Sequence, residues 1–320
     1  MIVSRINCCL LVVAFIMLVH AYKKDSDFLK AERYGGMTKI ILRVHDESDV
    51  PVACTDVKVL MGMTLRKNAY YITGQTDTNG LFIIEGITTG NEIVITLNKS
   101  GYYSSSRKLC YIEMGSEHEV CDGKWQPWGM VENIELRSIV NPLKNYVHAN
   151  LFIDIPRTNV WIGFDFERQG LLKPYGKGQI ADVEVKVDWD MLPPWKSTFC
   201  QVSMRFPHGH SGGIWSDSVL ESVFPFAYRA VENGLYEIKT LLVVDRTGPS
   251  LSTRVPFPEN RSMTARVRCC EDKKGRIIQQ NFVSIRNIDI CPSKYGTSLL
   301  SIMYVFNSTP NDTNLEATCR

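Results

Sequence analysis

Short runs in which apolar and polar residues alternate are the dominant pattern of this chain. In "EIVITL", Ile93, Ile95 and Leu97 share one face while Val94 and Thr96 take the other. This period of two is typical of a β-strand, because successive side chains of a strand point to opposite faces. Four further runs rich in Ile, Val, Tyr and Thr precede it at intervals of roughly ten residues, separated by Gly, Asn, Asp and Pro. That spacing predicts a β-sandwich.

The same alternation returns in the second half of the chain. Within "ADVEVKVDW", Val183, Val185 and Val187 alternate with charged residues, which predicts a strand with one buried and one wet face. No segment keeps a helical period for long, although "SDSVLESVF" is compatible with a short helix capped by Ser216 or Asp217. We therefore predict an all-β fold of two antiparallel β-sandwich domains.

The N-terminus has the three parts of a secretory signal peptide. A short segment with one positive charge precedes the twelve apolar residues "CCLLVVAFIMLV", and Val19-His20-Ala21 fits the small-residue pattern of a cleavage site. As a helix these residues reach about 18 Å, short of a hydrocarbon core of roughly 30 Å, so an uncleaved anchor is disfavoured. We expect residues 1–21 to be removed between Ala21 and Tyr22. The prediction is a secreted, extracellular protein, with the periplasm or cell envelope as the alternative.

Changes in composition divide the mature chain. Residues 22–38 are polar without an apolar period and predict a flexible leader. The β pattern that follows assigns residues 39–122 to the first sandwich. The Gly, Pro and Trp stretch "DGKWQPWGM" predicts a boundary, and residues 130–320 are assigned to a second β-rich domain of unknown function.

Composition and charge narrow the class of protein. The 320 residues are enough for two domains, and 44% hydrophobic with 22% charged residues is typical of a globular chain rather than a disordered one. The formal net charge of +2 provides no basic field that would attract a polyanion. Nucleic acid is therefore not expected as a partner.

Eight of the ten cysteines follow the leader, and an even number in an oxidising compartment predicts disulfides. Cys110 and Cys121 bracket a Gly-Ser turn, so a hairpin would bring them together. Cys269 and Cys270 are adjacent and on a strand would point to opposite faces, so they should not bond each other. One of these two is a candidate partner for Cys291. Zinc is disfavoured because no Cys-x-x-Cys occurs.

Three stretches of the first domain carry a family resemblance. In order they are "VHDESDVPVACTDVKV", "TGQTDTNGLFIIEGI" and "IVITLNKSGYYSS". They resemble the transthyretin-like, carboxypeptidase-regulatory-like sandwich, in which a turn with Pro precedes a strand and a Thr-Asp-x-x-Gly turn precedes an aromatic strand. The resemblance covers residues 39–121. It implies a spacer, adhesive or accessory module, a turn at Gly101, and a strand that begins with Tyr102 and Tyr103. The family often has Gly close to the first Pro, whereas this chain has Asp-Val-Pro. The second half of the chain carries no motif of a family that we recognise.

The stretch "GHSGG" matches the Gly-x-Ser-x-Gly nucleophile elbow, with Ser211 as the nucleophile. In that fold the histidine follows the serine, but the last histidine of this chain is His210, so a glycine-rich loop is the favoured interpretation. His208 and His210 could also hold a metal ion if Asp217, Glu221 or another residue supplied a third ligand. An exposed polar loop is the favoured alternative.

Two pairs of acids have the spacing of strand neighbours on one face, Asp165 with Glu167 and Asp182 with Glu184. A glycosidase needs two carboxyls about 5 to 10 Å apart, and such neighbours reach the lower limit. Same-face acids are more often the solvated side of a strand, and we favour that interpretation.

Tryptophan and asparagine residues supply candidate binding and modification sites. Trp195 and Trp215 could offer flat apolar faces to sugar rings, although such residues usually fill a sandwich core. Four Asn-x-Ser/Thr sites are candidates for glycosylation in a eukaryotic secretory pathway. They begin at Asn98, Asn260, Asn307 and Asn311.

Together these features predict an exported, non-enzymatic binding or structural protein that contacts a glycan or an extracellular protein. The alternative is an extracellular hydrolase that acts on a polymer, with its site in the second domain. No cofactor is expected, and no integral membrane segment is expected in the mature chain.

Overall fold

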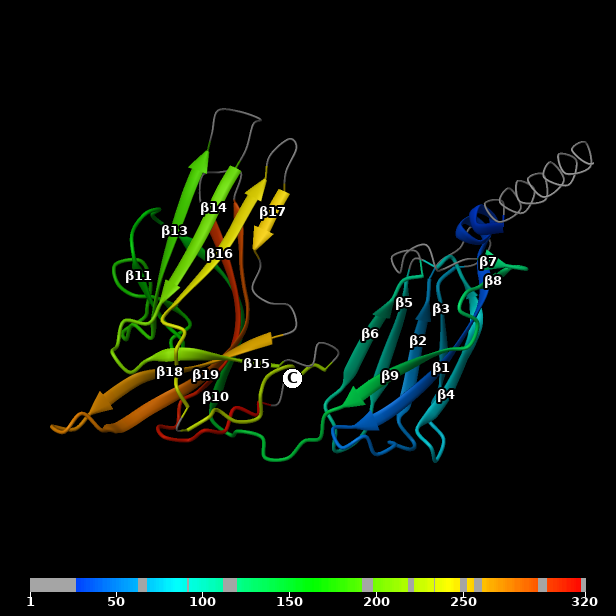
Figure 1. Ribbon diagram of the computed structural model, residues 1–320, viewed down its shortest axis with the longest axis horizontal. Helices are drawn as coiled ribbons and strands as arrows, with labels where there is room; N and C mark the ends of the chain where they lie inside the picture. The colour runs from blue at the N-terminus through cyan, green and yellow to red at the C-terminus, as the bar shows by residue number, and fades with distance from the viewer. Residues whose placement is uncertain are drawn as a thin grey trace, which may run out of the picture. The chain divides into compact units, whose positions relative to one another are not determined.

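The computed structural model describes residues 27–62, 68–90, 92–111, 120–191, 198–217, 222–232, 234–247, 252–255, 261–292 and 298–317. Within these ranges the side chains of residues 189–191, 198–200, 217, 242–247, 252–255, 289–292 and 298–299 are not described. The described chain consists of strands and one short helix at residues 27–34 (Figure 1). The prediction of an all-β fold is confirmed. The predicted signal peptide and its cleavage site at Ala21 and Tyr22 lie outside the described residues.

The chain divides into two compact units, and the boundary lies later than the sequence indicated. One unit comprises Met1–Ile139 with Glu221–Val223, and the other comprises Val140–Leu220 with Phe224–Arg320. The stretch "DGKWQPWGM" is not a linker, because the strands in and beside it pair with the first strand of the first unit. Its Gly and Pro residues form turns within that unit.

The first unit is a sandwich of two sheets. One sheet has the order β4-β1-β8-β7, with β9 also paired to β1, and the other has the order β3-β2-β5-β6. Neighbouring strands are antiparallel, except that β8 and β9 run parallel to β1. The strands are β1 (Gly36–Asp46), β2 (Asp56–Met61), β3 (Tyr70–Gln75), β4 (Leu81–Thr88), β5 (Ile93–Asn98), β6 (Ser105–Leu109), β7 (Val120–Cys121), β8 (Lys124–Trp125) and β9 (Met130–Leu136).

The core of the first unit follows the alternation read from the sequence. In β5 the side chains of Ile93, Ile95 and Leu97 are fully buried, as predicted, and they pack against apolar residues of β1, β2 and β9. The indole of Trp125 in β8 is also fully buried and donates a hydrogen bond of 2.8 Å to the carbonyl of Thr88. Packing of aliphatic faces from both sheets therefore forms this unit.

Part of the predicted flexible leader is a packed helix instead. In the helix at residues 27–34, Ala31 is buried and belongs to the core of the first unit. Phe28, three residues earlier on the same helix face, meets Trp125 edge to face with ring centroids 5.9 Å apart. The apolar residues of this segment were too few to reveal a helical period, so the tertiary contact with Trp125 decides its structure.

Two predicted turns of the first unit are present. Gly101 has φ 86°, in the left-handed region that glycine tolerates, and the N–H of Tyr102 donates to the carbonyl of Lys99. The following strand β6 begins at Ser105, not at Tyr102 as expected. In the turn before β4, Gly80 has φ 71° and its N–H donates to the carbonyl of Asp77.

The second unit is also a two-sheet sandwich. Its sheets have the orders β10-β20-β19-β18-β15 and β12-β11-β13-β14-β16-β17, with antiparallel neighbours throughout the described strands. The strands are β10 (Tyr146–Ile155), β11 (Ile162–Asp165), β12 (Gly170–Leu171), β13 (Val183–Met191), β14 (Thr198–Arg205), β15 (Gly212–Asp217), β16 (Thr240–Thr247), β17 (Ser252–Val255), β18 (Arg261–Glu271), β19 (Ile277–Pro292) and β20 (Ser298–Asn307).

Strand alternation in the second unit matches the prediction in β13, where Val183, Val185 and Val187 are buried in a core that both sheets share. The helix considered at Ser216 or Asp217 does not begin there, because both residues continue β15. In β18 the ladder is irregular: its pairing with β19 shifts between Val267 and Cys270. A bulge of this kind redirects side chains, and it positions the polar cluster described next.

Candidate functional site

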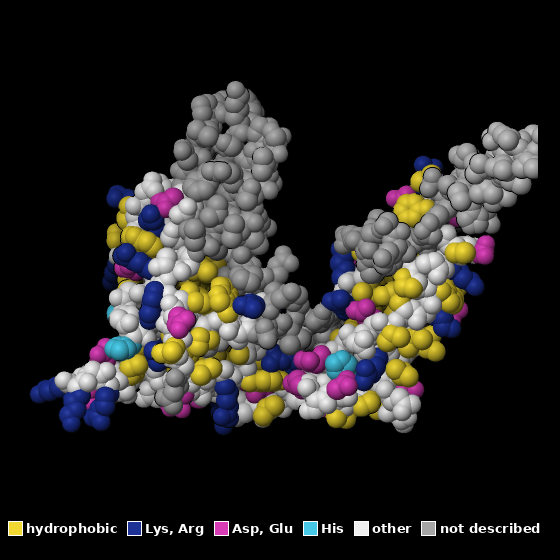
Figure 2. All heavy atoms as spheres, viewed as in Figure 1, with side chains coloured by type: hydrophobic (Ala, Val, Ile, Leu, Met, Phe, Trp, Pro, Cys, Tyr) yellow, Lys and Arg dark blue, Asp and Glu magenta, His cyan; other side chains and the backbone are white. Residues whose placement is uncertain are grey.

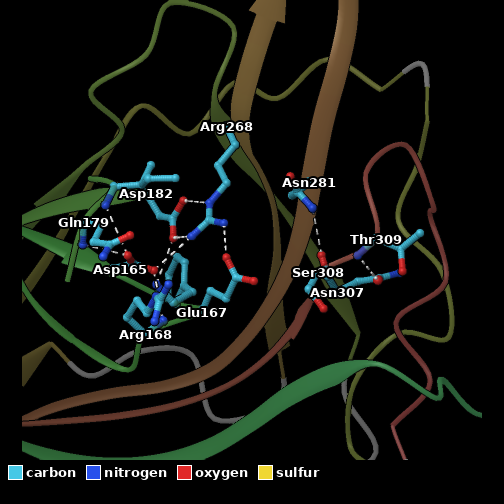
Figure 3. Close-up of polar contacts among 12 residues, drawn as sticks. Asp165, Glu167, Arg168, Gln179, Asp182, Arg268, Asn281, Asn307, Ser308 and Thr309 are labelled. Atoms are coloured by element: carbon cyan, nitrogen blue, oxygen red, sulfur yellow. Dashed lines mark hydrogen bonds and ion pairs between the residues drawn. The ribbon is translucent and has the colours of Figure 1, made fainter. Parts of the chain in front are cut away.

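A cluster of charged side chains lies inside the second unit, where the two sheets face each other (Figure 3). We call it the Arg268 cluster; it consists of Arg268, Asp165, Glu167 and Asp182. Arg268 comes from the bulge in β18 of one sheet. Asp165 ends β11, Glu167 lies in the turn after it, and Asp182 immediately precedes β13 of the other sheet. The cluster therefore connects the two sheets through side chains.

The guanidinium of Arg268 donates to all three carboxylates. Its Nε lies 2.8 Å from Asp182 Oδ1, and its Nη2 lies 3.1 Å from Asp182 Oδ2 and 2.9 Å from Asp165 Oδ1. Its Nη1 donates to Glu167 Oε2. Asp165 and Asp182 are 1% and 0% exposed, whereas Glu167 is 44% exposed. The contact with Asp182 is a bidentate ion pair, the geometry that suits a planar guanidinium.

Backbone N–H groups complete the hydrogen bonds of the two buried carboxylates. Asp165 accepts from the N–H groups of Arg168, Gln179 and Ile180, at 2.9 to 3.1 Å. Asp182 accepts from the N–H of Phe166 at 2.8 Å. These donors come from the loops on either side of β12, so the carboxylates hold both loops and the arginine together.

Burial and hydrogen bonding act on these carboxyls in opposite directions. Burial alone raises the pKa of Asp165, but the N–H donors of Gln179, Arg168 and Ile180, with the charge of Arg268, outweigh it and hold this pKa below its usual value. For Asp182, burial is the larger effect and raises the pKa, although Arg268 and the Phe166 N–H favour its charged form. The two acids therefore respond differently to pH.

Aromatic side chains form the wall of the cluster. The guanidinium carbon of Arg268 lies 4.9 Å from the centroid of the Phe306 ring, a cation–π contact. The hydroxyl of Tyr304 donates to the carbonyl of Phe166 at 2.7 Å, and burial raises the pKa of Tyr304 strongly. The cluster is thus a closed network, and its arrangement serves to clamp the two sheets.

Ser211 lies in a second polar group near the cluster, but it does not have the surroundings of a nucleophile elbow. Ser211 is fully buried and its Oγ donates to the sulfur of Cys269 at 3.6 Å. Lys239 donates to the Ser211 carbonyl at 2.6 Å, and Arg266 donates to the His210 carbonyl at 2.9 Å. The loop leads into strand β15 rather than a helix.

The two candidate metal ligands in this loop both lie at the surface. The imidazole Nε2 of His210 lies 3.1 Å from Glu271 Oε1, and both side chains are substantially exposed. His208 is exposed as well. In the described part of the chain, no group of three or more His, Cys, Asp or Glu residues has the arrangement of a metal site.

The tryptophans expected to bind sugar are only partly described. Trp195 lies outside the described residues. Trp215 is on β15, where it is half-buried and packs against the core of the second unit. Its ring therefore mainly packs against the core of the second unit.

The predicted disulfide between Cys110 and Cys121 is wrong, since both are free thiols. Cys110 follows β6 of one sheet, whereas Cys121 ends β7 of the other sheet. The strands next to the two cysteines therefore belong to different sheets and do not pair with each other. A third thiol, Cys54, is free and exposed.

A bridge from Cys269 or Cys270 to Cys291 is also wrong, because both adjacent thiols are free. The register explains this result. Cys270 lies opposite Gln279, and Cys291 is twelve residues further along β19. At roughly 3.3 Å per residue of strand, the separation is about 40 Å.

The glycosylation candidates have different surroundings. Asn98 and Asn311 are exposed, and Asn260 lies outside the described residues. Asn307 is fully buried, and its Nδ2 donates to the carbonyls of Asp312 and Asn314 and to the Asp312 carboxylate. Because a glycan would occupy this Nδ2, the packing at Asn307 does not fit that modification.

Sequence reasoning placed the four paired acids on solvated strand faces; Glu167 and Glu184 are partly or largely exposed, whereas Asp165 and Asp182 are buried. Glu184 is partly exposed and pairs with the exposed Arg205 at 2.6 Å. Asp165 and Asp182 are buried instead, because each accepts bonds from Arg268 and from nearby N–H groups. No pattern along the chain points to Arg268, which lies 86 residues from Asp182 and 103 residues from Asp165.

Comparisons with known proteins add little. No family model and no curated protein sequence matches the chain. Among solved structures, one match is 3-chlorocatechol 1,2-dioxygenase from Rhodococcus opacus 1CP, with 15% sequence identity and a TM-score of 0.27. The match covers 33% of this chain and 62% of that enzyme, which is less than two thirds of its length. Such a likeness is too weak to indicate a fold or an activity for this chain.

Within the part of the chain that the structure describes, no helix has both the length and the apolar character needed to cross a membrane.

Proposed function

We propose that this chain is an exported binding or structural protein without catalytic activity, and that its partner is an extracellular protein rather than a glycan. The observation that carries this proposal is the burial of two of the three carboxylates in the Arg268 cluster. Asp165 and Asp182 are buried and are hydrogen-bonded to Arg268 and to backbone N–H groups. A general acid or base must instead reach the proton of a substrate.

Ser211 supports the same conclusion. A nucleophilic serine needs a base within hydrogen-bond reach and an exposed oxygen. Ser211 is fully buried and donates to Cys269, while the ring of the neighbouring His210 pairs with Glu271. The loop is therefore arranged for packing.

A row of apolar side chains on the first unit suits a protein partner. The register places Ile83 of β4, Ile41 of β1 and Val131 of β9 side by side on the outer face of their sheet. Ile83 and Val131 are 56% and 55% exposed. An ion pair between Lys39 and Glu85 borders the row, and Figure 2 shows hydrophobic side chains on this face among polar ones. An apolar strip with a charged rim is typical of protein contact surfaces.

We also propose that the first unit is a transthyretin-like, carboxypeptidase-regulatory-like module. Its support is the two-sheet sandwich, the turn from Asp77 to Gly80 before β4, and the glycine turn at Gly101 after β5. Such a module fits an adhesive or accessory role, in agreement with the proposed function.

Secretion and catalysis can be tested on one preparation. We expect the chain expressed in eukaryotic cells to appear in the medium with Tyr22 as its first residue, by mass spectrometry of the N-terminus. We expect the purified protein to release no product from a panel of polysaccharides and proteins. Turnover that Glu167→Gln abolishes and the control Glu184→Gln retains would refute the proposal, because Glu167 is the exposed acid of the Arg268 cluster.

Binding needs a separate measurement. The double variant Ile83→Thr and Val131→Thr keeps β-branched side chains but removes apolar surface from the row. We expect it to bind to intact cells several-fold more weakly than the unmodified protein. Val50→Thr is the matched control, since Val50 is 54% exposed but lies outside the row. Equal binding to cells by all three proteins would contradict a protein partner at this face. Binding of the purified protein to glycans on an array would contradict it as well.

A further inference from the structure

Cys269 and Cys270 lie where the pairing of β18 with β19 loses its regular register. The pairing shifts between Val267 and Cys270 and again between Cys270 and Glu271. Arg268 has φ 54°, in the left-handed region that a non-glycine residue rarely adopts. From residue 268 to residue 271, two half-buried residues are followed by two exposed ones. The strand geometry that separates neighbouring side chains onto opposite faces is therefore interrupted here.

The two thiols differ in the way that a reactive pair requires. Cys270 is exposed and can meet a reagent from solution, whereas Cys269 is half-buried. Burial raises the pKa of Cys269, while the Ser211 hydroxyl, Arg266 and Lys239 act in the opposite direction by favouring its thiolate. Cys270 is thus suited to attack a reagent, and Cys269 is suited to attack the product that this first step leaves on Cys270.

We propose that Cys269 and Cys270 form a redox-active dithiol that small anionic disulfides oxidise to a vicinal disulfide. The Cys270 thiol loses a proton, and its thiolate attacks one sulfur of the reagent; a mixed disulfide forms and one thiolate leaves. The Cys269 thiol then loses its proton and attacks the Cys270 sulfur, which releases the second thiolate. The protein loses two protons and two electrons, and the reagent disulfide is reduced to two thiols.

A bond between neighbouring residues is expected to be easily reduced. Consecutive α-carbons across a trans peptide are about 3.8 Å apart, below the usual range of roughly 4.4–6.8 Å for a disulfide. Such a bond stores strain and has a more oxidising potential than a structural disulfide. Because Arg268 is the preceding residue, closing the ring also changes the backbone that directs its side chain to the carboxylates. The proposal thus links the redox state of the pair to the clamp between the sheets.

The charge around Cys270 favours an anionic reagent. The hairpin between β18 and β19 carries Lys273, Lys274 and Arg276, all exposed, against the carboxylates of Glu271 and Asp272. Figure 2 shows the resulting group of basic side chains at the tip of this hairpin. Glutathione disulfide, whose carboxylates give it negative charge, fits this surface better than cystamine, a cationic disulfide of similar chemistry.

The test uses the full mature chain, reduced and then exposed to glutathione disulfide near neutral pH. We expect peptide mapping to show that the peptide with Cys269 and Cys270 has lost two hydrogens and retains no glutathione. Glutathione disulfide should oxidise the pair several-fold faster than cystamine does, and Lys273→Glu with Lys274→Glu should remove this preference. A stable glutathione adduct on Cys270 with a free Cys269, or a bridge from either residue to another cysteine, would overturn the proposal.

Two variants separate the roles of the thiols. In Cys269→Ser, the mixed disulfide on Cys270 should accumulate because the second attack is lost. In Cys270→Ser, an exposed position where folding should tolerate the change, Cys269 should remain a thiol. Cys121→Ser is the control, since Cys121 is an isolated exposed thiol, and it should leave ring formation unchanged. Oxidation of Cys269 at the normal rate in Cys270→Ser would contradict the assigned order of attack.

Discussion

The two units are sandwiches of similar architecture whose interiors are held in different ways. In the first unit, neutral contacts meet at the centre: Trp125 donates to a backbone carbonyl, and the hydroxyls of Thr38 and Tyr111 lie 2.6 Å apart. In the second unit, a guanidinium and two buried carboxylates join the sheets. The same layer geometry is therefore combined with neutral hydrogen bonds at the centre of one unit and with an ion-paired cluster in the other, although the first unit also buries one charged residue, Arg137.

This difference has consequences for stability. Apolar burial stabilises a core in proportion to the area removed from water and is insensitive to pH. A buried ion pair contributes little net stability over an apolar replacement, but removing one partner is costly because the other charge stays buried. The second unit should therefore be the more sensitive to single charge-removing substitutions, and the contribution of Asp165, whose pKa is lowered, should be lost in acid.

The largest effect is expected for Arg268→Met. This change leaves Asp165 and Asp182 without their cation, and we expect the second unit to lose about 3–5 kcal/mol of unfolding free energy. Denaturant titration combined with hydrogen exchange should show faster exchange in β13 and β18 while β2 and β5 keep their protection. Arg276→Met is the matched control, because Arg276 is 74% exposed in its pair with Asp272, and it should behave like the unmodified protein. Equal loss in both units would refute a clamp local to the second.

A smaller, pH-dependent effect is expected for Asp165→Asn. The pKa of Asp165 is lowered in the folded chain, so its contribution is present above the ordinary carboxyl pKa of 3.8 and is lost as pH falls through the lowered value. We expect the variant to be less stable by about 1–3 kcal/mol near neutral pH. The gap should close below pH 3.8, as measured by denaturant titration at several pH values. Asp182 titrates in both proteins, and the variant also loses the Asp165 charge that helps to raise the pKa of Asp182. A gap that is constant with pH would contradict the role of Asp165 as a carboxylate.

The smallest effect is expected in the first unit, for Ile95→Val. Ile95 is fully buried in β5, and deleting one methylene should cost about 0.5–1.5 kcal/mol. The loss should be the same at neutral and acidic pH, as judged by denaturant titration and by exchange of β5 amides. A loss that varied with pH would show that the first unit also depends on a titrating group, and the contrast between the units would fail.

The elements set by local pattern were predictable from the sequence. The alternation in β5 and β13 and the turn that ends at Gly80 follow from side-chain period and from the backbone freedom of glycine, which act within a few residues. The helix at residues 27–34 was missed, because its contact with Trp125 joins positions almost one hundred residues apart. The pattern of apolar and polar residues along the chain does not indicate a contact between such distant positions.

The candidate site was beyond prediction for a related reason. Arg268 occupies a bulge with a positive φ, a conformation for which its residue type gives no signal. Its partners Asp165 and Asp182 have the spacing of ordinary strand acids, and only the three-dimensional fold shows that both face Arg268. The disulfide assignments failed likewise, because they assumed a hairpin at Cys110 and a short separation along β19.

The clamp between the sheets of the second unit is tested most directly by a double-mutant cycle of Arg268→Met and Asp182→Asn. Unfolding free energies of the four proteins give the coupling between the two side chains, free of the cost that each change has alone. We predict a coupling energy of about 1–3 kcal/mol, since each single variant leaves a buried polar partner behind. Additive losses, with a coupling energy of roughly zero, would show that the bidentate contact does not hold the sheets together.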